Sequence, residues 1–377
     1  MMFAVDHINS DRSLLPRVRL GAEILDTCAR DTYALNQSLE FVRASFSNLD
    51  ASEFECQDGS EPTPKSDQRA VAGVIGGSGS DVSIHVANLL RLFKIPQISY
   101  ASTSAALSDK TRFDYFARTV PPDTFQAKAM ADIVELFNWT YVSTIASEGD
   151  YGQAGIDSFV QEARARNICV ATSEKIPTSS NNATFDAIVK SLRKKANAKG
   201  VIMFTRMEDS RAFMESLGRM SARQEFTLIA SDAWGNQQGV VDGLRARAAE
   251  GAITINPKSE VVAEFDDYLF SLRPRNNSRN PWFDEFWQHK FSCRLSRADD
   301  VANSSLPTCD PRLTLNGDNT KQDNKVQFVI DAVYAMAHAL HNMHRDLCPR
   351  DAGLCQRMKK IDGHLLYNQY ILNVSFL

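Results

Sequence analysis

The sequence predicts an α/β protein with parallel sheets of the doubly wound type, and three observations lead to this prediction. Short apolar runs, such as 139–145, 200–205 and 226–230, have the pattern of buried strands. They alternate along the chain with helical segments of roughly 10–15 residues, which is the order expected of βαβ units. The length of 377 residues makes two domains the natural expectation.

The individual elements are expected in the following order. The expected strands are 18–25, 70–75, 96–100, 139–145, 168–172, 200–205 and 226–230, and the segments 116–120 and 251–255 are not assigned to an element. The expected helices are 33–46, a segment from about 82, 123–137, a segment before 168, 185–195, 209–220, 261–272, 282–291 and 326–344. Pro121 and Pro122 mark the expected crossing between domains, and 251–255 is expected to return to the first domain. The polar segments 47–68 and 294–324 are expected loops.

Composition and charge exclude several classes of protein. Hydrophobic residues make up 43% of the chain and charged residues 23%, which suffices for ordinary cores. The net charge of −4 gives no reason to expect nucleic acid or a membrane surface as a partner. No stretch approaches the roughly 18 uncharged apolar residues of a bilayer span. We expect no signal peptide, because Met1–Ile8 has the pattern of a helix interior.

The cysteines and glycosylation sequons indicate an oxidising compartment. The seven cysteines show no CxxC spacing, so a zinc site is not expected. Cys348 and Cys355 bracket a short polar loop, and Cys293 and Cys309 bracket another, which suggests disulfides. Six acceptor sequons point the same way. They begin at Asn36, Asn138, Asn182, Asn276, Asn303 and Asn373.

The turn Gly76–Ser80 is the first candidate for binding a ligand. It joins the apolar run 70–75 to a helix that starts near Val82, an arrangement that directs backbone N–H groups and hydroxyls at an anion. No Lys-Ser/Thr pair follows, so it is not a P-loop, and the third glycine of a dinucleotide fingerprint is absent. Its serines favour a small anion such as a carboxylate. The alternative is a tight strand-to-helix connection without a ligand.

The ends of the other strands carry groups that complement an α-amino acid. Ligands of doubly wound sheets sit beyond the carboxyl ends of the strands. Ser80 and Thr103 can donate hydrogen bonds to the carboxylate of an amino acid. Asp123, Tyr151 and Asp232 can receive its ammonium group. Taken singly, each residue also has a structural explanation as a turn residue, helix cap, Asx turn or packed aromatic.

Enzyme motifs are missing. The sequence has no HExxH, GxSxG or SxxK arrangement. His338, His341 and His344 share a helical spacing that could bind a metal, but such a face is more often solvated or packed. The paired acids 266–267 and 299–300 show no sign of a catalytic pocket. We therefore predict neither an enzyme nor a metal or cofactor site.

At the strand ends the sequence resembles a known family, the extracellular ligand-binding domain of metabotropic glutamate receptors, which are class C G-protein-coupled receptors. The resemblance covers essentially the whole chain, and group II members and divergent insect members are the most similar. The stretches that carry it are ILDTC (24–28), DTYAL (31–35), PQISYASTS (96–104), FNWTYVS (137–143), ASEGDYG (146–152), NPWF (280–283) and AVYAMAH (332–338).

The resemblance implies a two-lobed, periplasmic-binding-protein-like clamshell of type I. Lobe 1 would comprise 1–119 and 249–377, and lobe 2 would comprise 120–248. By this likeness Ser80 and Thr103, with backbone from Ala101, would hold the α-carboxylate. Thr103, Asp123 and Asp232 would hold the ammonium group, with Tyr151 against it from lobe 2. The implied ligand-binding residues are Ser80, Ala101, Ser102, Thr103, Asp123, Tyr151 and Asp232, with Arg206 and Gln237 near the distal end of the ligand.

The family also holds the side-chain carboxylate of glutamate with basic residues. One is an arginine that would lie upstream of Met1, and the other is a lysine shortly after an Asp-Gly pair. Here Leu365 stands at that lysine position, with His364 and Lys360 nearby. Two smaller departures are Ala233 in place of glycine and Met207 in place of serine. We therefore expect that the amino-acid head is bound, whereas glutamate itself is in doubt as the ligand.

The resemblance also implies how the chain pairs and where it works. Cys293–Cys309 and Cys348–Cys355 would be intrachain disulfides, and Cys56 would bond a second subunit. Cys28 would pair with a cysteine upstream of Met1, and Cys169 with a cysteine-rich domain beyond residue 377. The expected dimer face comprises Leu35, Leu89, Leu92 and Phe93, although all four could be core residues.

The implied protein is a receptor at the extracellular face of the plasma membrane. It would form a homodimer or a dimer with a related receptor, and it would reach a G protein through a membrane part absent from this sequence, which looks truncated at both ends. The alternative is a soluble amino-acid-binding protein with the same clamshell. An encoded membrane segment downstream would discriminate between these two functions.

Overall fold

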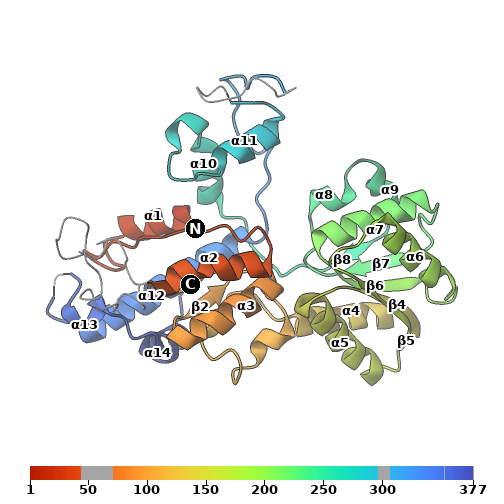
Figure 1. Cartoon of the computed structure of the whole chain (residues 1–377), viewed down its shortest axis with the longest axis horizontal. Coiled ribbons are helices and arrows are strands. Elements are labelled where there is room, and N and C mark those ends of the chain that lie inside the picture. The colour runs from red at the N-terminus through yellow and green to blue at the C-terminus, as the bar shows by residue number, and fades with distance from the viewer. Residues whose placement is uncertain (44–70, 296–305, 352, 377) are drawn as a thin grey trace, which may run out of the picture. The chain divides into compact units, whose positions relative to one another are not determined.

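The computed structural model describes residues 1–43, 71–295, 306–351 and 353–376. The chain forms two compact units, a larger one of Phe3–Lys258 with Phe328–Leu377 and a smaller one of Ser259–Gln327. The larger unit contains two parallel β-sheets, and all candidate ligand-binding residues lie in it (Figure 1). The smaller unit contains the helices α10 (Ala263–Ser271) and α11 (Phe283–Phe291).

The first sheet contains three parallel strands in the order β1-β2-β3. They are β1 (Val74–Ile75), β2 (Gln97–Ser99) and β3 (Phe116–Arg118). The strands are short, but β2 is buried along its whole length, as expected for the central strand of a covered parallel sheet. The helices that pack with residues of this sheet include α2 (Asp31–Arg43), α3 (Ser80–Leu90) and α12 (Val326–Leu347).

Both faces of this sheet are covered by apolar side chains, as the adjacent residues Val74 and Ile75 show. Val74 packs in a cluster with residues of α2 and α3, such as Val82. Ile75 packs against a different cluster, which is formed largely by α1 (Met2–Ser10) and α12. Successive side chains of a strand point to opposite faces, so each face receives its own apolar layer.

The second sheet contains five parallel strands in the order β5-β4-β6-β7-β8. They are β4 (Tyr141–Ser147), β5 (Cys169–Ile176), β6 (Gly200–Phe204), β7 (Thr227–Ala230) and β8 (Ile253–Thr254). The chain adds β5 on one side of β4 and then β6 on the other. This reversal is a topological switch point, where doubly wound sheets bind their ligands.

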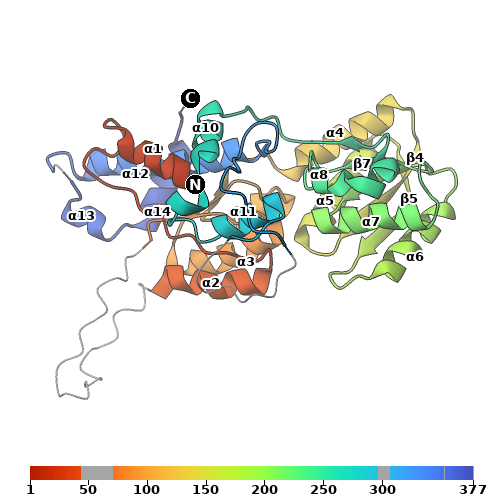
Figure 2. The same ribbon diagram turned by 90° about the horizontal axis from the view of Figure 1, so that it is seen from above.

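Helices cover both faces of the second sheet. Val201 and Met203 of β6 pack with α6 (Asn182–Arg193) and α7 (Met207–Arg219). Ile202 and Phe204 pack on the opposite face with α4 (Asp123–Leu136) and α5 (Asp150–Ala165). Figure 1 shows α4 and α5 on one side of the sheet and α6 and α7 on the other, and Figure 2 gives the perpendicular view. The predicted α/β class with doubly wound parallel sheets is confirmed.

The remaining elements are short. In the larger unit they are η3 (Arg91–Phe93), η4 (Ala105–Ser108), α8 (Gln238–Val241), η5 (Gly243–Arg245), α9 (Ala246–Ala249), α13 (Gln356–Lys359), α14 (Gly363–Leu365), η7 (Leu366–Tyr370) and η8 (Ile371–Asn373). The smaller unit adds η6 (Pro274–Asn276).

Two expectations differ from the structure. The segment 18–25 alternates in sequence but forms no strand, and the Asn9 side chain bonds both backbone groups of Leu20. Its Oδ1 accepts the Leu20 N–H at 2.8 Å and its Nδ2 donates to the Leu20 carbonyl at 2.9 Å. The run 251–255 was expected to return to the first domain, but β8 pairs in parallel with β7 and extends the second sheet.

Most of the cysteines and sequons lie in the described residues, so their bonding and exposure can be stated. Both predicted intrachain disulfides, Cys293–Cys309 and Cys348–Cys355, are formed. Cys28 and Cys169 are unbonded and exposed. The asparagines of five sequons are exposed, as glycan attachment requires. Cys56 and Asn303 lie outside the described residues.

Replacing Gly155 with alanine is expected to destabilise the protein by about 2–3 kcal/mol, since overpacked cores lose energy of this order. A methyl group at this position of α5 would overlap the buried ring of Phe204. Chemical denaturation followed by circular dichroism measures the effect. The matched control is Gly21→Ala, because a methyl group there meets no atom within 4 Å. Equal stability of the two variants would contradict this account of the α5 packing.

Candidate ligand-binding site

The candidate residues follow the carboxyl ends of the strands in both sheets. Ser80 follows β1 and begins α3, Thr103 follows β2, and Asp123 follows β3 and begins α4. In the second sheet Tyr151 follows β4 and Asp232 follows β7. Three of the five, Ser80, Asp123 and Tyr151, therefore lie in the first turn of a helix, where backbone N–H groups have no partner within the helix.

The turn after β1 is fixed by side chains from β2 and the loop after it. Gly76 has a φ of +130°, which favours glycine. The Gly76 carbonyl accepts from Gln97 Nε2 at 2.8 Å, and the Gly77 carbonyl accepts from Ser99 Oγ at 2.7 Å. Ser80 is buried, and its Oγ accepts the N–H of Ser104 at 3.1 Å. The hydroxyl hydrogen of Ser80 thus remains available to donate to an anion at the start of α3.

The loop after β2 divides into residues that support the site and residues that can face a ligand. Ser102 donates from Oγ to Ser83 at 2.7 Å, and its N–H donates to Ser99 Oγ at 3.0 Å. Its carbonyl accepts from the Arg118 guanidinium at 3.2 Å. All polar groups of Ser102 are engaged within the protein, so the structure gives it a supporting role. Ala101 is buried, and its N–H also faces Ser99 Oγ, at 3.3 Å.

Asp123 and Asp232 form a buried pair of carboxylates. Their relative exposures are 0% and 4%. A single amide joins them, because Gln126 Nε2 donates to Asp123 Oδ1 at 2.8 Å and to Asp232 Oδ1 at 3.0 Å. Gln126 Oε1 also accepts the N–H of Asp232 at 3.0 Å. Burial, and then the negative charge of Asp232, raise the pKa of Asp123 to about 8.

Two polar atoms beside this pair are buried without a hydrogen-bond partner. They are Asp123 Oδ2 and Thr103 Oγ1. The Thr103 hydroxyl lies close enough to favour the charged form of Asp123, but the two groups do not meet hydrogen-bond geometry. Buried polar atoms rarely lack partners, and such atoms in a native structure often mark a place for a ligand, ion or water.

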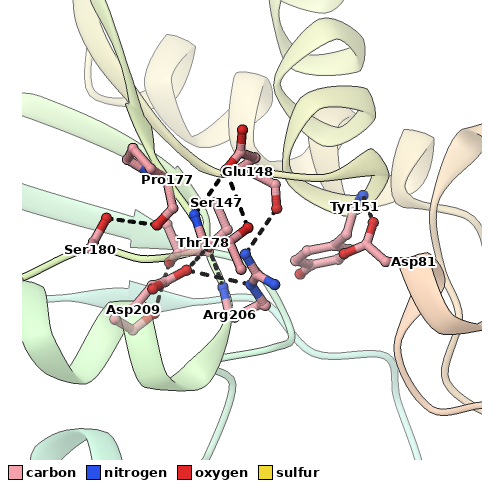
Figure 3. Close-up of polar contacts among 11 residues, drawn as sticks. Asp81, Ser147, Glu148, Tyr151, Pro177, Thr178, Ser180, Arg206 and Asp209 are labelled. Carbon is pink, nitrogen blue, oxygen red and sulfur yellow. Dashed lines mark hydrogen bonds and ion pairs between the residues drawn. The ribbon is translucent and has the colours of Figure 1, made fainter. Parts of the chain in front are cut away.

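Tyr151 connects the pair to the beginning of α5. Its hydroxyl donates to Asp232 Oδ1 at 3.1 Å and lies 2.7 Å from Ser231 Oγ. Burial and the two nearby aspartates raise the pKa of the Tyr151 hydroxyl well above its usual value, so it stays neutral. The backbone N–H of Tyr151 donates to Asp81 Oδ1 at 3.2 Å, as Figure 3 shows.

Arg206 and Gln237, expected near the distal end of a ligand, begin α7 and α8 respectively. Arg206 Nη2 donates to the Glu148 carbonyl at 2.9 Å, and its Nε lies 3.5 Å from Asp209 Oδ2 (Figure 3). Its side chain is 35% exposed, so it is still accessible to a solute. Gln237 is half-buried, and its N–H donates to the Trp234 carbonyl at 2.8 Å.

Leu365 lies in a different environment from the carboxylate pair. It is half-buried and packs against the apolar cluster of α1 and α12. The preceding residue, His364, is exposed, and its Nδ1 lies 3.0 Å from the Tyr115 hydroxyl. Tyr115 precedes β3, whereas the candidate binding residues follow the strands. Lys360 is exposed.

The three histidines of α12 have separate structural partners. His341 Nδ1 accepts the N–H of Leu15 at 3.1 Å, His344 Nε2 lies 2.9 Å from the Gly353 carbonyl, and His338 stacks on Phe376. Within the described residues no group of three or more His, Cys, Asp or Glu side chains is arranged to hold a metal ion.

The residues that sequence reasoning missed are those that hold the candidate binding residues in place. Gln126 was not predicted, although it lies three residues after Asp123, a spacing that places both on one face of a helix. Arg118 was also missed; it holds the Ser102 and Ser104 carbonyls from β3. Neither Arg118 nor Asp81 belongs to a local motif that would indicate its partner.

The parallel sheets and the polar strand ends define a ligand-binding protein of the receptor class. The chain belongs to the family described as "Receptor family ligand binding region", whose model matches residues 1–377. This is a family of receptor ligand-binding regions rather than of enzymes, in agreement with the prediction. The match also supports the predicted type I periplasmic-binding-protein-like class.

More particularly, the chain is similar to metabotropic glutamate receptors. It is 48% identical over 420 residues to "Metabotropic glutamate receptor" of Drosophila melanogaster, and 50% identical over 378 residues to "Metabotropic glutamate receptor 4" of Rattus norvegicus. Both alignments cover 100% of this chain but only 43% and 41% of the relatives. The chain thus spans about two-fifths of the length of these relatives. Among the described residues no helix is both long and apolar enough to cross a membrane.

Proposed function

We propose that the chain binds an α-amino acid between the strand ends of its two sheets, as the ligand-binding part of a class C receptor. The observation that carries this proposal is the buried pair Asp123 and Asp232, with Asp123 Oδ2 left without a partner. Two buried carboxylates so close together are unfavourable without a cation. The ammonium group of an amino acid supplies that cation.

The groups around the pair complement the rest of an amino-acid head. The Ser80 hydroxyl and the N-terminus of α3 offer donors to the α-carboxylate. The buried Thr103 hydroxyl has no partner and can bind the same head. Ala101 contributes backbone, and Tyr151 places its ring and hydroxyl beside Asp232. These residues divide into an anion-binding set and a cation-binding set, as a zwitterion requires.

A binding screen with a matched pair of variants tests this function. Isothermal titration with the standard L-amino acids should find at least one that binds, and Thr103→Val should weaken that binding by roughly tenfold, the value of about one hydrogen bond to a charged group. Ser143→Ala is the control, because Ser143 Oγ is also buried without a partner but lies within β4. Binding of no amino acid, or equal affinities of the two variants, would contradict the proposal.

The identity of the amino acid depends on the group that meets its side chain. The named relatives are glutamate receptors, so a glutamate-like ligand is the first candidate. The apolar Leu365 argues for a different side chain, because a buried γ-carboxylate without its cation loses on the order of 3–5 kcal/mol. We propose that the protein binds glutamate weakly and prefers another α-amino acid.

Leu365→Lys is expected to raise the affinity for L-glutamate by at least tenfold, because it supplies the missing positive charge. Titration calorimetry with glutamate measures the change. Leu365→Met is the control, since it preserves apolar packing at this half-buried position without adding charge. Micromolar binding of glutamate by the unmodified protein would show that the charge is supplied from elsewhere.

The receptor context extends the proposal to the longer protein. We propose that the chain is the extracellular part of a membrane receptor that signals to a G protein, as the partial coverage of its relatives suggests. In this proposal lobe 1 comprises 1–119 and 249–377 and lobe 2 comprises 120–248, except that β8 (Ile253–Thr254) belongs to the second sheet. The finer similarity to group II or to divergent insect receptors also belongs to this proposal, although the rat relative is a group III receptor. A soluble amino-acid-binding protein is the alternative, and a membrane segment in the encoding transcript would exclude it.

We further propose a homodimer, or a dimer with a related receptor, through α2 and the end of α3. Leu92 is 74% exposed and Leu35 36% exposed, so neither is a core residue. Leu89 and Phe93 are half-buried. Apolar side chains gathered in one exposed place favour a protein partner. Cys56, which lies outside the described residues, would bond the two subunits.

A further inference from the structure

We propose that Asp123 and Asp232 share one proton in the ligand-free protein, and that binding of a ligand's ammonium group expels this proton to solvent. The proposal rests on the proposed amino-acid binding but adds a step to it. Amino-acid binding at this site would then be an exchange of one cation for another, and its affinity would depend on pH.

The geometry holds the two carboxylates together whether or not a ligand is present. One nitrogen, Gln126 Nε2, donates to an oxygen of each carboxylate, at 2.8 Å and 3.0 Å. The same side chain accepts the backbone N–H of Asp232, so the amide is anchored at both ends. The carboxylates cannot separate to relieve their repulsion without breaking these bonds. Two carboxylates at such a spacing cannot both stay ionised at little cost, and one of them takes up a proton.

The charged groups that face the pair do not remove this repulsion. Arg118 of β3 is the cation that acts on Asp123, but its guanidinium already donates to the Ser102 and Ser104 carbonyls. Tyr151 of α5 contributes a neutral hydroxyl, and Thr103 and Gln126 are uncharged. Burial and the charge of Asp232 outweigh these groups and raise the pKa of Asp123 to about 8. Asp123 is the more buried of the two and has the unpartnered oxygen, so the proton belongs on Asp123.

The exchange balances in atoms and charge. The ligand-free pair consists of one carboxylic acid and one carboxylate, with a net charge of −1. The bound pair consists of two carboxylates around one ammonium group, again with a net charge of −1. The O–H bond of Asp123 breaks, its electron pair stays on the carboxylate, and the proton passes to a buffer base in the solvent. No oxidant, reductant or further reactant takes part.

A quantitative expectation follows from the pKa of about 8 for Asp123. At pH 7 about 0.9 proton should be released for each ammonium group bound, by the linkage between protonation and binding. The association constant should therefore rise roughly tenfold between pH 6 and pH 7 and level off above pH 8. Without the shared proton, affinity would be nearly constant over this range.

The first experiment is isothermal titration at pH 7 in phosphate and in Tris, which differ in their enthalpy of ionisation. The probe is the best-binding amino acid of the standard L-series, and the difference in binding heat between the buffers counts the protons released. The unmodified protein should release close to one proton, whereas Asp123→Asn should release none. Asp331→Asn is the control, because burial also raises the pKa of Asp331, which lies on α12 away from the pair. Binding without proton release would overturn the inference but leave the proposed function intact.

A second measurement uses the ligand-free protein, so it does not depend on variants that still bind an amino acid. Infrared spectroscopy of the ligand-free protein with ¹³C-labelled aspartate detects a protonated carboxyl group by its C=O band. This band should be present at pH 7 and should vanish on titration to pH 9.5. It should be absent from Asp123→Asn at pH 7, and it should persist in Asp331→Asn. If no amino acid binds, the proposed function fails, and the infrared band alone decides the inference; its absence from the unmodified protein would overturn it.

Discussion

Replacing Asp232 with asparagine is expected to weaken amino-acid binding by a factor of a few hundred or more, while making the ligand-free protein more stable. The loss follows because the ligand's ammonium group would enter a buried site with one of its two carboxylates removed, which costs on the order of 3–5 kcal/mol. Titration calorimetry measures the affinity, and thermal unfolding measures the stability.

The gain in stability has the same physical origin as the loss in binding. Asp232 is 4% exposed, so replacing its carboxylate with a neutral amide removes the cost of burying a charged group, on the order of 1–3 kcal/mol. Asparagine keeps an oxygen in the place of Oδ1, which can still accept from Gln126 and Tyr151. Hydrogen bonding around the site is therefore largely preserved.

The control for this substitution is Asp157→Asn, which removes a charge from an exposed position of α5. It should change neither affinity nor stability by more than a few tenths of a kcal/mol, as is usual for surface substitutions. An Asp232→Asn variant that binds normally would mean that the ammonium group is held elsewhere. A variant that is less stable than the unmodified protein would mean that burying the Asp232 carboxylate costs little in the ligand-free protein.

The second large effect is expected in the pH dependence of stability without ligand. Burial and the nearby charge of Asp232 raise the pKa of Asp123 to about 8 in the folded protein, from the ordinary aspartate value of 3.8. Between these values the folded state binds more protons than the unfolded state, so its stability decreases as pH rises. The slope approaches about 1.4 kcal/mol per pH unit, which amounts to as much as about 4 kcal/mol between pH 4 and pH 7.

Urea unfolding at a series of pH values from 5 to 8 measures this dependence. The Asp123→Asn variant should lose the decrease, so the difference between the two proteins isolates the contribution of this residue. Carboxylates with lowered pKa values, such as Asp132 and Asp186, lose their stabilising effect only as pH falls below about 4, outside the measured range. A parallel pH profile for the variant and the unmodified protein would show that Asp123 is ionised throughout.

The sequence allowed most strands, and the place of the candidate binding residues after them, to be predicted, because both depend on the order of residues within short segments. Buried strands such as β6 form continuous apolar runs. The polar residues that follow such strands lie at the same edge of the sheet, because the carboxyl ends of parallel strands meet there. Asp123 and Asp232 could therefore be placed together although they are far apart in the chain. The expectation of a ligand-binding site at this edge follows from the same rule, since ligands of such sheets bind beyond the carboxyl ends of the strands.

The predictions that failed depend on partners that are distant in sequence. The alternating segment 18–25 forms no strand, and the Asn9 side chain bonds both backbone groups of Leu20, a contact that no pattern within the segment indicates. The run 251–255 carries no mark of the sheet it joins, and only its pairing with β7 decides it. The contact of the Ser102 hydroxyl with Ser83 could not be predicted either, because Ser83 lies 19 residues away in sequence.

The hydroxyl and the backbone N–H of Tyr151 make separate contacts, so a change of side chain can alter one and leave the other. Its hydroxyl meets Asp232, whereas its backbone N–H meets the Asp81 carboxylate of α3. Gly149 leaves room for this carboxylate, since a methyl group there would lie only 2.7 Å from Asp81 Oδ2. A side chain at 151 can therefore be exchanged without loss of the α3–α5 contact, whereas Gly149 and Asp81 must be kept together. A substitution at position 151 can thus change the surroundings of Asp232 while the bond between α3 and α5 is retained.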